Sequence, residues 1–256
     1  MKKTSLFLVF MLIALLGAGT ASFAKCTATT FPTGNGIWGF ETAGLASGNY
    51  YNSLFQVTFV SGGTFSGTEW DSNAGTISGP TAVSGTWSAT TLAGCEYTMK
   101  VTSPSTQTFN FTLNNGGKNG IIVQIDAGYT TVGQMAEQGT VTCSSATFKS
   151  KQFSLYSQGY IPSVGGLVTG TGELLFDKTG TIISGDSTVT LDLGGAGNLV
   201  LPASGSATLG ANCQGSSVLT TPAGSFDSDT VVVDEGKESF FLVTNAGDNV
   251  SGYLLE

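Results

Sequence analysis

Carboxylates are the only plausible acid and base groups in this sequence, and three of them stand out. Glu69 and Asp71 flank Trp70, and Glu173 lies in a second segment of related sequence. Two carboxylates on either side of a glycosidic bond can hydrolyse it. Glu69 and Asp71 also fall near the end of a predicted strand, where acidic residues are most simply solvated turn residues. We favour this second interpretation, so no catalytic residue is assigned and the protein is predicted not to be an enzyme.

The sequence lacks the groups on which many other sites depend. It contains no histidine, which excludes Ser-His-Asp and Cys-His nucleophiles. It has no arginine to clamp phosphate, and its net charge is −8. Nucleic acids are bound through clusters of basic residues, which such a sequence does not offer. Nucleic acid is therefore excluded as a partner. No cofactor is predicted, because no phosphate-binding loop precedes a helix.

Four acidic residues near the end of the chain could gather around calcium: Asp227, Asp229, Asp234 and Glu235. Their order lacks the EF-hand pattern with its central glycine, so we interpret them as solvated acids. No metal site is predicted.

The aromatic residues indicate where a ligand could bind. All three tryptophans lie in the first half of the chain, close in sequence to Tyr50 and Tyr51. Trp38 shares a strand face with Phe40 and is expected in the core. Trp70 shares its face with polar residues, so we expect its indole to project outward, where it could stack on a sugar or line a barrel mouth. Contact with the neighbouring half is the alternative. The ligand-binding candidates are Trp70, Trp38, Tyr50 and Tyr51.

Two related hairpins organise the elements that carry these residues. Gln56–Gly67 and Glu173–Gly185 each contain a run of alternating residues, a glycine turn and a second run, which is typical of a β-hairpin. Equivalent positions such as Phe59 and Phe176 lie about 117 positions apart. This spacing predicts a tandem duplication, with a first β repeat at residues 25–142 and a second at residues 143–256.

The four cysteines follow the same spacing, with Cys26 and Cys95 in one repeat and Cys143 and Cys213 in the other. In a secreted chain they are expected to be paired, which leaves no thiolate for catalysis or zinc. Pairing within repeats gives Cys26–Cys95 and Cys143–Cys213. Pairing between repeats is equally symmetric, but we prefer the first arrangement because a duplicated unit usually keeps its own disulfide.

Short alternating runs separated by Gly, Asn, Ser and Pro predict an all-β protein. We expect each repeat to be an antiparallel barrel or sandwich of seven to eight strands with one disulfide. A short helix is expected at Val132–Glu137. The predicted strands lie near residues 37–40, 54–60, 64–70, 83–90, 97–101, 109–113, 121–126 and 140 in the first repeat, and near residues 153–156, 173–176, 181–189, 198–201, 217–220, 230–234, 239–244 and 250–255 in the second.

Residues 1–24 are typical of a signal peptide. Lys2 and Lys3 precede the apolar stretch Leu6–Leu16, and Ser22–Ala24 resembles a cleavage site. No transmembrane span is expected after its removal. The protein is predicted to be secreted or periplasmic, and bacterial.

A local pattern in the first repeat resembles the start of calycin barrels, the lipocalin and avidin-like group. Gly36-Ile37-Trp38 opens the first strand, and Phe65-Ser66-Gly67-Thr68 follows after a glycine turn. The resemblance covers about the first 50 residues of that repeat, and Leu155 falls where Trp38 would recur in the second. It implies a barrel that holds a small, often apolar ligand in its mouth, and it carries over no ligand-contacting residue.

Two functions from different classes remain. The first is a secreted noncatalytic β protein with a structural, surface or protein-contact role. The alternative is a binding protein whose first repeat holds a small apolar molecule or a glycan. An enclosed cavity larger than about 300 Å³ and lined by apolar side chains would favour binding, and a filled core would favour the structural role.

Overall fold

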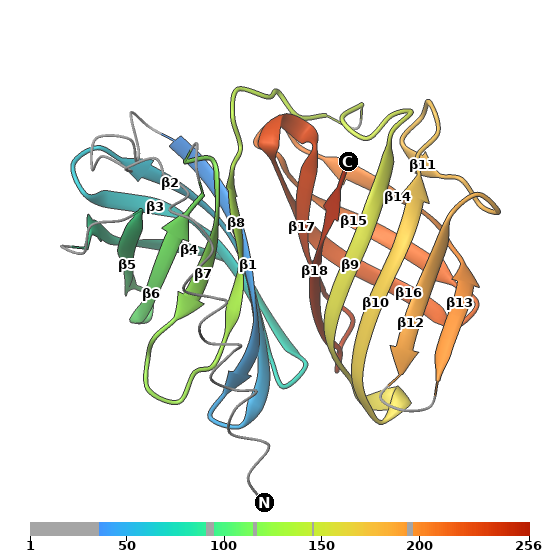
Figure 1. Cartoon of the computed structure of the whole chain (residues 1–256), viewed down its shortest axis with the longest axis horizontal. Coiled ribbons are helices and arrows are strands. Elements are labelled where there is room, and N and C mark those ends of the chain that lie inside the picture. Colours follow the sequence, from blue (N-terminus) through green and yellow to red (C-terminus); the bar gives the residue numbers. More distant parts are fainter. Residues whose placement is uncertain (1–35, 91–94, 115–116, 145, 194–196) are drawn as a thin grey trace, which may run out of the picture.

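A computed structural model of the protein describes residues 36–90, 95–114, 117–144, 146–193 and 197–256. Within these residues the chain forms two separate antiparallel sheets, so the all-β prediction is confirmed (Figure 1). We call strands β1–β8 the first half and strands β9–β18 the second half. The signal peptide predicted at residues 1–24 lies outside the described residues.

The first half is a closed barrel of eight strands in sequential order. β1 pairs with both β2 and β8 and so closes the ring. Trp38 and Phe40 of β1 belong to the barrel core, whereas Gly39 and Glu41 face the second half. The strands are β1 (Gly36–Ala46), β2 (Asn49–Val60), β3 (Thr64–Asn73), β4 (Thr76–Ala89), β5 (Glu96–Ser103), β6 (Gln107–Leu113), β7 (Asn119–Gln124) and β8 (Val132–Glu137).

The second half is a curled sheet of ten strands in the order β11-β14-β15-β16-β17-β18-β9-β10-β12-β13. Two short 3-10 turns connect successive strands, Pro162–Val164 between β9 and β10 and Asp234–Gly236 between β16 and β17. The strands are β9 (Gln152–Ile161), β10 (Gly166–Leu175), β11 (Thr181–Ile182), β12 (Thr188–Leu193), β13 (Asn198–Pro202), β14 (Ser204–Leu209), β15 (Gln214–Thr221), β16 (Gly224–Val233), β17 (Glu238–Val243) and β18 (Asn249–Leu255).

The strands of the two halves follow a similar circular order. β18 pairs with β9 as β8 pairs with β1, and β10 pairs with β12 as β2 pairs with β3. The second ring is broken at Ala203, because β13 pairs with β12 whereas β14 pairs with β15 and the short β11. The second half therefore has ten strands, more than the seven to eight predicted, and its sheet is not a closed barrel.

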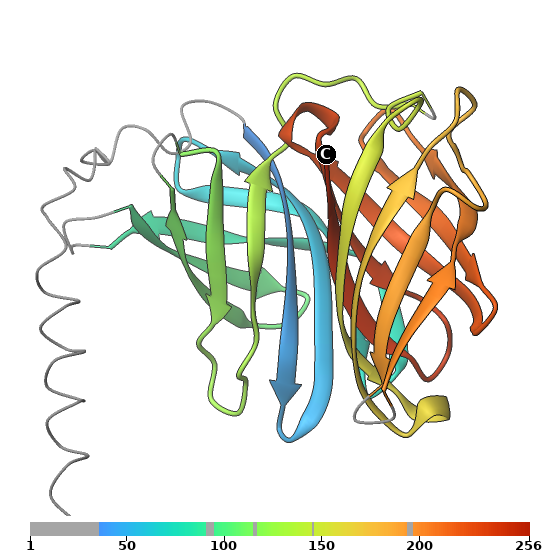
Figure 2. The ribbon, with the colours of Figure 1, turned by 45° about the vertical axis from the view of Figure 1, so that its right-hand side comes forward.

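The outer face of the barrel packs against the outer face of the curled sheet (Figure 1, Figure 2). Gln56 of β2 accepts a hydrogen bond from Gln214 at 2.7 Å, and Asn249 of β18 donates to the backbone oxygen of Tyr50 at 2.6 Å. The apolar residues buried between the halves are Leu54, Trp70 and Ala136 from the first and Val231, Val233, Phe240 and Leu242 from the second.

The segment Val132–Glu137 is a strand, so the predicted helix is wrong. The segment completes the barrel by pairing with β1 and β7, and Met135 lies in the barrel core while Ala136 faces the second half. Pairing with strands on both sides and burial on both faces favour the strand more than the weak helix preference of so short a segment favours a helix.

Cys143 and Cys213 form a disulfide, as the preferred pairing predicted. The alternative pairing between repeats is wrong, because it requires Cys213 to bond Cys95. Cys26 lies outside the described residues, so the pair Cys26–Cys95 stays a prediction. In the part of the chain that the structure describes, no helix is long and apolar enough to cross a membrane.

Candidate functional site

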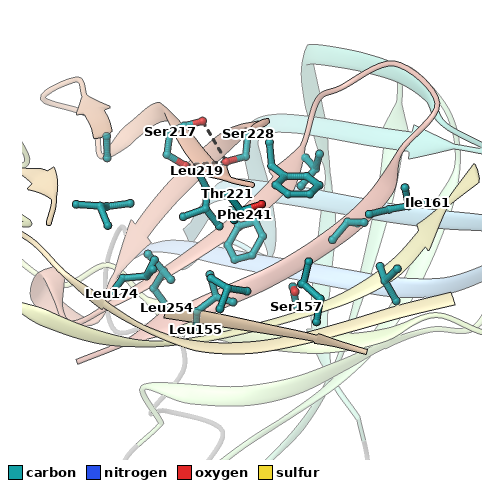
Figure 3. Close-up of a pocket in the computed structure, with 18 of the residues that line it drawn as sticks. Leu155, Ser157, Ile161, Leu174, Ser217, Leu219, Thr221, Ser228, Phe241 and Leu254 are labelled. Carbon is teal, nitrogen blue, oxygen red and sulfur yellow. Dashed lines mark hydrogen bonds between the residues drawn. The ribbon is translucent and has the colours of Figure 1, made fainter. Parts of the chain in front are cut away.

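A cavity lies inside the curled sheet of the second half (Figure 3). The cavity has a volume of about 80 Å³. Leu155, Leu174 and Leu254 lie on one side and the pair Ser217 and Ser228 on the other. The remaining lining residues are Ser157, Ile161, Val168, Phe176, Ile182, Val189, Leu191, Ala207, Leu219, Thr221, Phe226, Phe241, Val243 and Val250.

Strand alternation explains why the cavity is apolar. In β17, Phe241 and Val243 line the cavity, whereas Phe240 and Leu242 point the other way and pack between the halves. Successive side chains of a strand point to opposite faces, so one strand can supply both surfaces. On the β14 wall, Ala207 lines the cavity and is partly exposed.

The polar groups of the cavity are hydroxyls. Ser157, Ser217, Thr221 and Ser228 are the polar lining residues, and none of the described lining residues is ionisable. The hydroxyls of Ser217 and Ser228 are 2.7 Å apart, and the Ser217 hydroxyl is 3.2 Å from that of the buried Thr230. Such a cavity can bind an apolar molecule and hold one polar group of it.

The interior of the first half is filled by packed rings instead. Phe40 stacks on Phe55 with ring centroids 4.4 Å apart, and Phe109 packs edge-on against both. Tyr97 and Phe111 stack nearby at 5.2 Å. These buried residues belong to one aromatic and aliphatic cluster.

The four predicted ligand-binding residues do not converge on one site. Trp38 is buried in the barrel core, and Tyr50 stacks on Tyr160 of the second half with centroids 4.6 Å apart. Tyr51 is buried, and its hydroxyl donates to Glu69 at 3.4 Å. None of the four lines the cavity of the second half. Their ligand-binding role stays a prediction.

Trp70 is only 5% exposed, so the expectation that its indole reaches solvent is wrong. The side chain does leave the barrel interior, but the second half covers the surface that it reaches. The alternative interpretation, contact with the neighbouring half, is confirmed.

Glu69 is buried, which contradicts its interpretation as a solvated turn residue. Its Oε1 accepts hydrogen bonds from Gln107 at 2.8 Å and from Tyr51 at 3.4 Å. Burial raises the pKa of Glu69 to about 7, the negative charge of Asp71 adds to the rise, and the two hydrogen bonds oppose it. Asp71 is half-buried and is hydrogen-bonded by Ser78. A β-bulge between Glu69 and Asp71 interrupts the pairing with β4.

The other acidic candidates lie apart from this pair. Glu173 is exposed on β10 of the second half and is hydrogen-bonded by Gln152. Of the residues that the structure describes, no group of three or more His, Cys, Asp or Glu is placed to hold a metal ion, and this includes the acids at positions 227, 229, 234 and 235.

Sequence reasoning missed the cavity of the second half and the buried carboxyl of Glu41. The Ser251 hydroxyl donates to Glu41 Oε2 at 3.0 Å across the contact between the halves. Burial raises the pKa of Glu41 to about 7.

The alternation of residues in β15 and β16 was a usable signal for strands. It could not reveal the cavity, because a strand that lines a cavity has the same residue pattern as one that faces a packed core.

No family model and no curated protein matches the chain. Among solved structures, kievitone hydratase from Nectria haematococca is 13% identical, with a TM-score of 0.28 and coverage of 93% of each chain. A candidate AttH protein from Nitrosomonas europaea is 11% identical, with a TM-score of 0.33, and the match covers 91% of this chain and 98% of that one. With TM-scores below 0.5, these similarities carry no argument about function.

Proposed function

We propose that the protein binds a small apolar molecule in the cavity of its second half and performs no catalysis. The observation that carries this proposal is the cavity, whose walls are mostly aliphatic and aromatic and carry only a few hydroxyls. Ligand sites are typically concave and apolar, with a small number of polar groups that fix orientation. The proposal places the ligand in the second half rather than the first, because packed rings fill the barrel interior.

We also propose that the chain works outside the cytoplasm and arose by duplication. The disulfide Cys143–Cys213 supports export, since such bonds persist in oxidising compartments. The similar circular strand order of the two halves supports duplication. A purely structural or protein-contact role is the competing function, and it does not account for the cavity.

Fluorescence of the neutral apolar dye N-phenyl-1-naphthylamine tests the proposal. The dye should brighten on binding to the protein, and Ala207→Phe should weaken binding by about tenfold, because Ala207 lines the cavity and the larger ring would occupy part of it. Thr208→Phe is the matched control, since Thr208 is exposed on the opposite face of β14. Unchanged binding in Ala207→Phe, or no brightening with the unmodified protein, would contradict the proposal.

A further inference from the structure

A cluster of hydroxyl groups is the main polar feature of the cavity wall. Ser217 and Ser228, on neighbouring strands β15 and β16, both line the cavity, and Thr230 lies next to them as a buried residue that does not line it. The Ser217 hydroxyl is within hydrogen-bond distance of both others, at 2.7 Å from that of Ser228 and 3.2 Å from that of Thr230. We propose that the ligand is a neutral molecule that carries a hydroxyl group, which binds at Ser217 and Ser228. This proposal rests on the proposed function.

The absence of charge from the described cavity wall excludes ionised ligands. No lysine and no carboxylate is among the described residues that line it. A bound carboxylate would lose its hydration without gaining a cation, and a bound ammonium would lose its hydration without gaining an anion. Either penalty is far larger than the cost of burying a hydroxyl that finds a hydrogen-bond partner. Neutral ligands are therefore selected over fatty acids and amines of the same length.

The hydroxyl cluster accepts more hydrogen bonds than it can donate. Each hydroxyl has one proton and two lone pairs, so three hydroxyls bring three protons and six acceptor sites. Ser228 is also placed to donate to the backbone oxygen of Ser217, at 3.4 Å. The three contacts within the cluster are enough to engage its three protons, and its acceptor sites outnumber those protons. A ligand hydroxyl, which can donate, matches this surface better than an ether, which can only accept.

Competition against the bound dye at pH 8 separates these ligand classes. The probes are 1-octanol, its isomer heptyl methyl ether, and octanoate. We expect 1-octanol to displace the dye at about fivefold lower concentration than the ether, the value of one net hydrogen bond. Octanoate should need at least about tenfold more than 1-octanol.

Two variants test the position of the hydroxyl. In the double variant Ser217→Ala/Ser228→Ala, the advantage of 1-octanol over the ether should fall below about twofold, while the affinity for the ether stays unchanged. Ser216→Ala is the matched control, because Ser216 is exposed on the other face of β15, and it should keep the full advantage.

If octanoate competes as well as 1-octanol, the ligand is not restricted to neutral molecules and the proposal is wrong. It is also wrong if the double variant still binds 1-octanol more tightly than heptyl methyl ether by the full factor. In both cases dye binding still supports the proposed function. A protein that binds neither the dye nor any of the three probes contradicts the proposed function itself. If the double variant fails to fold, the comparison of the three probes on the unmodified protein still tests whether the ligand is a neutral molecule with a hydroxyl group.

Discussion

Glu41 is a carboxyl group buried between the two halves, with only 3% of the residue exposed. Loss of hydration raises its pKa from 4.5 to about 7, Glu238 adds to the rise, and the hydrogen bonds from Ser251 and the backbone of Gln134 oppose it. The folded state therefore binds the proton more tightly than the unfolded state does. With respect to this group, the free energy of unfolding is greatest below about pH 4.5, falls as the pH rises to about 7, and is level above that.

The variant Glu41→Gln should remove this pH dependence. At pH 8 we expect it to raise the free energy of unfolding by on the order of 3 kcal/mol, because the amide never ionises. At pH 4.5 and below, where the glutamate is largely protonated when folded, the two proteins should differ by less than about 1 kcal/mol. Urea unfolding at both pH values measures the difference, and an equal effect at both would contradict the assignment. Glu69 and Glu238, whose pKa values burial also raises to about 7, add to the same trend in the unmodified protein.

The disulfide Cys143–Cys213 links the segment after β8 to the turn between β14 and β15. The two cysteines are 70 positions apart in sequence. Closing a loop of that length removes about 4 kcal/mol of conformational entropy from the unfolded chain in the loop-closure model. The double variant Cys143→Ala/Cys213→Ala should lose about that much stability in urea unfolding. A loss below about 1 kcal/mol would show that the bond contributes little.

Individual strands were predictable from sequence, whereas their assembly was not. Alternation within a segment identified most strands and placed Trp38 in the core, because the pattern that decides these features is local. The burial of Trp70 and Glu41 depends on Val231 and Ser251, which lie far along the chain and contact them only after both sheets have formed. The strand at Val132–Glu137 was missed for the same reason, since pairing with β1 decides its conformation.

The two halves approach each other closely at Gly39 of β1. A Cβ atom there would lie 2.6 Å from Val233 Cγ1 and 2.8 Å from Val231 Cγ1. Gly39→Ala should therefore force the halves apart or distort them, and it should lower the free energy of unfolding by about 1–3 kcal/mol.

Urea unfolding compares this variant with Gly62→Ala, whose added atom meets nothing within 4 Å. We expect the control to match the unmodified protein to within about 0.5 kcal/mol. Gly39→Ala with the stability of Gly62→Ala would mean that the contact between the halves is not tightly packed.

Strand β17 belongs to both surfaces, with Phe241 and Val243 toward the cavity and Phe240 and Leu242 toward the barrel. A shift of its backbone changes both sets of contacts at once. A substitution or a ligand that moved β17 would therefore alter the packing of the cavity wall and of the contact with the barrel together, and any such coupling would be reciprocal.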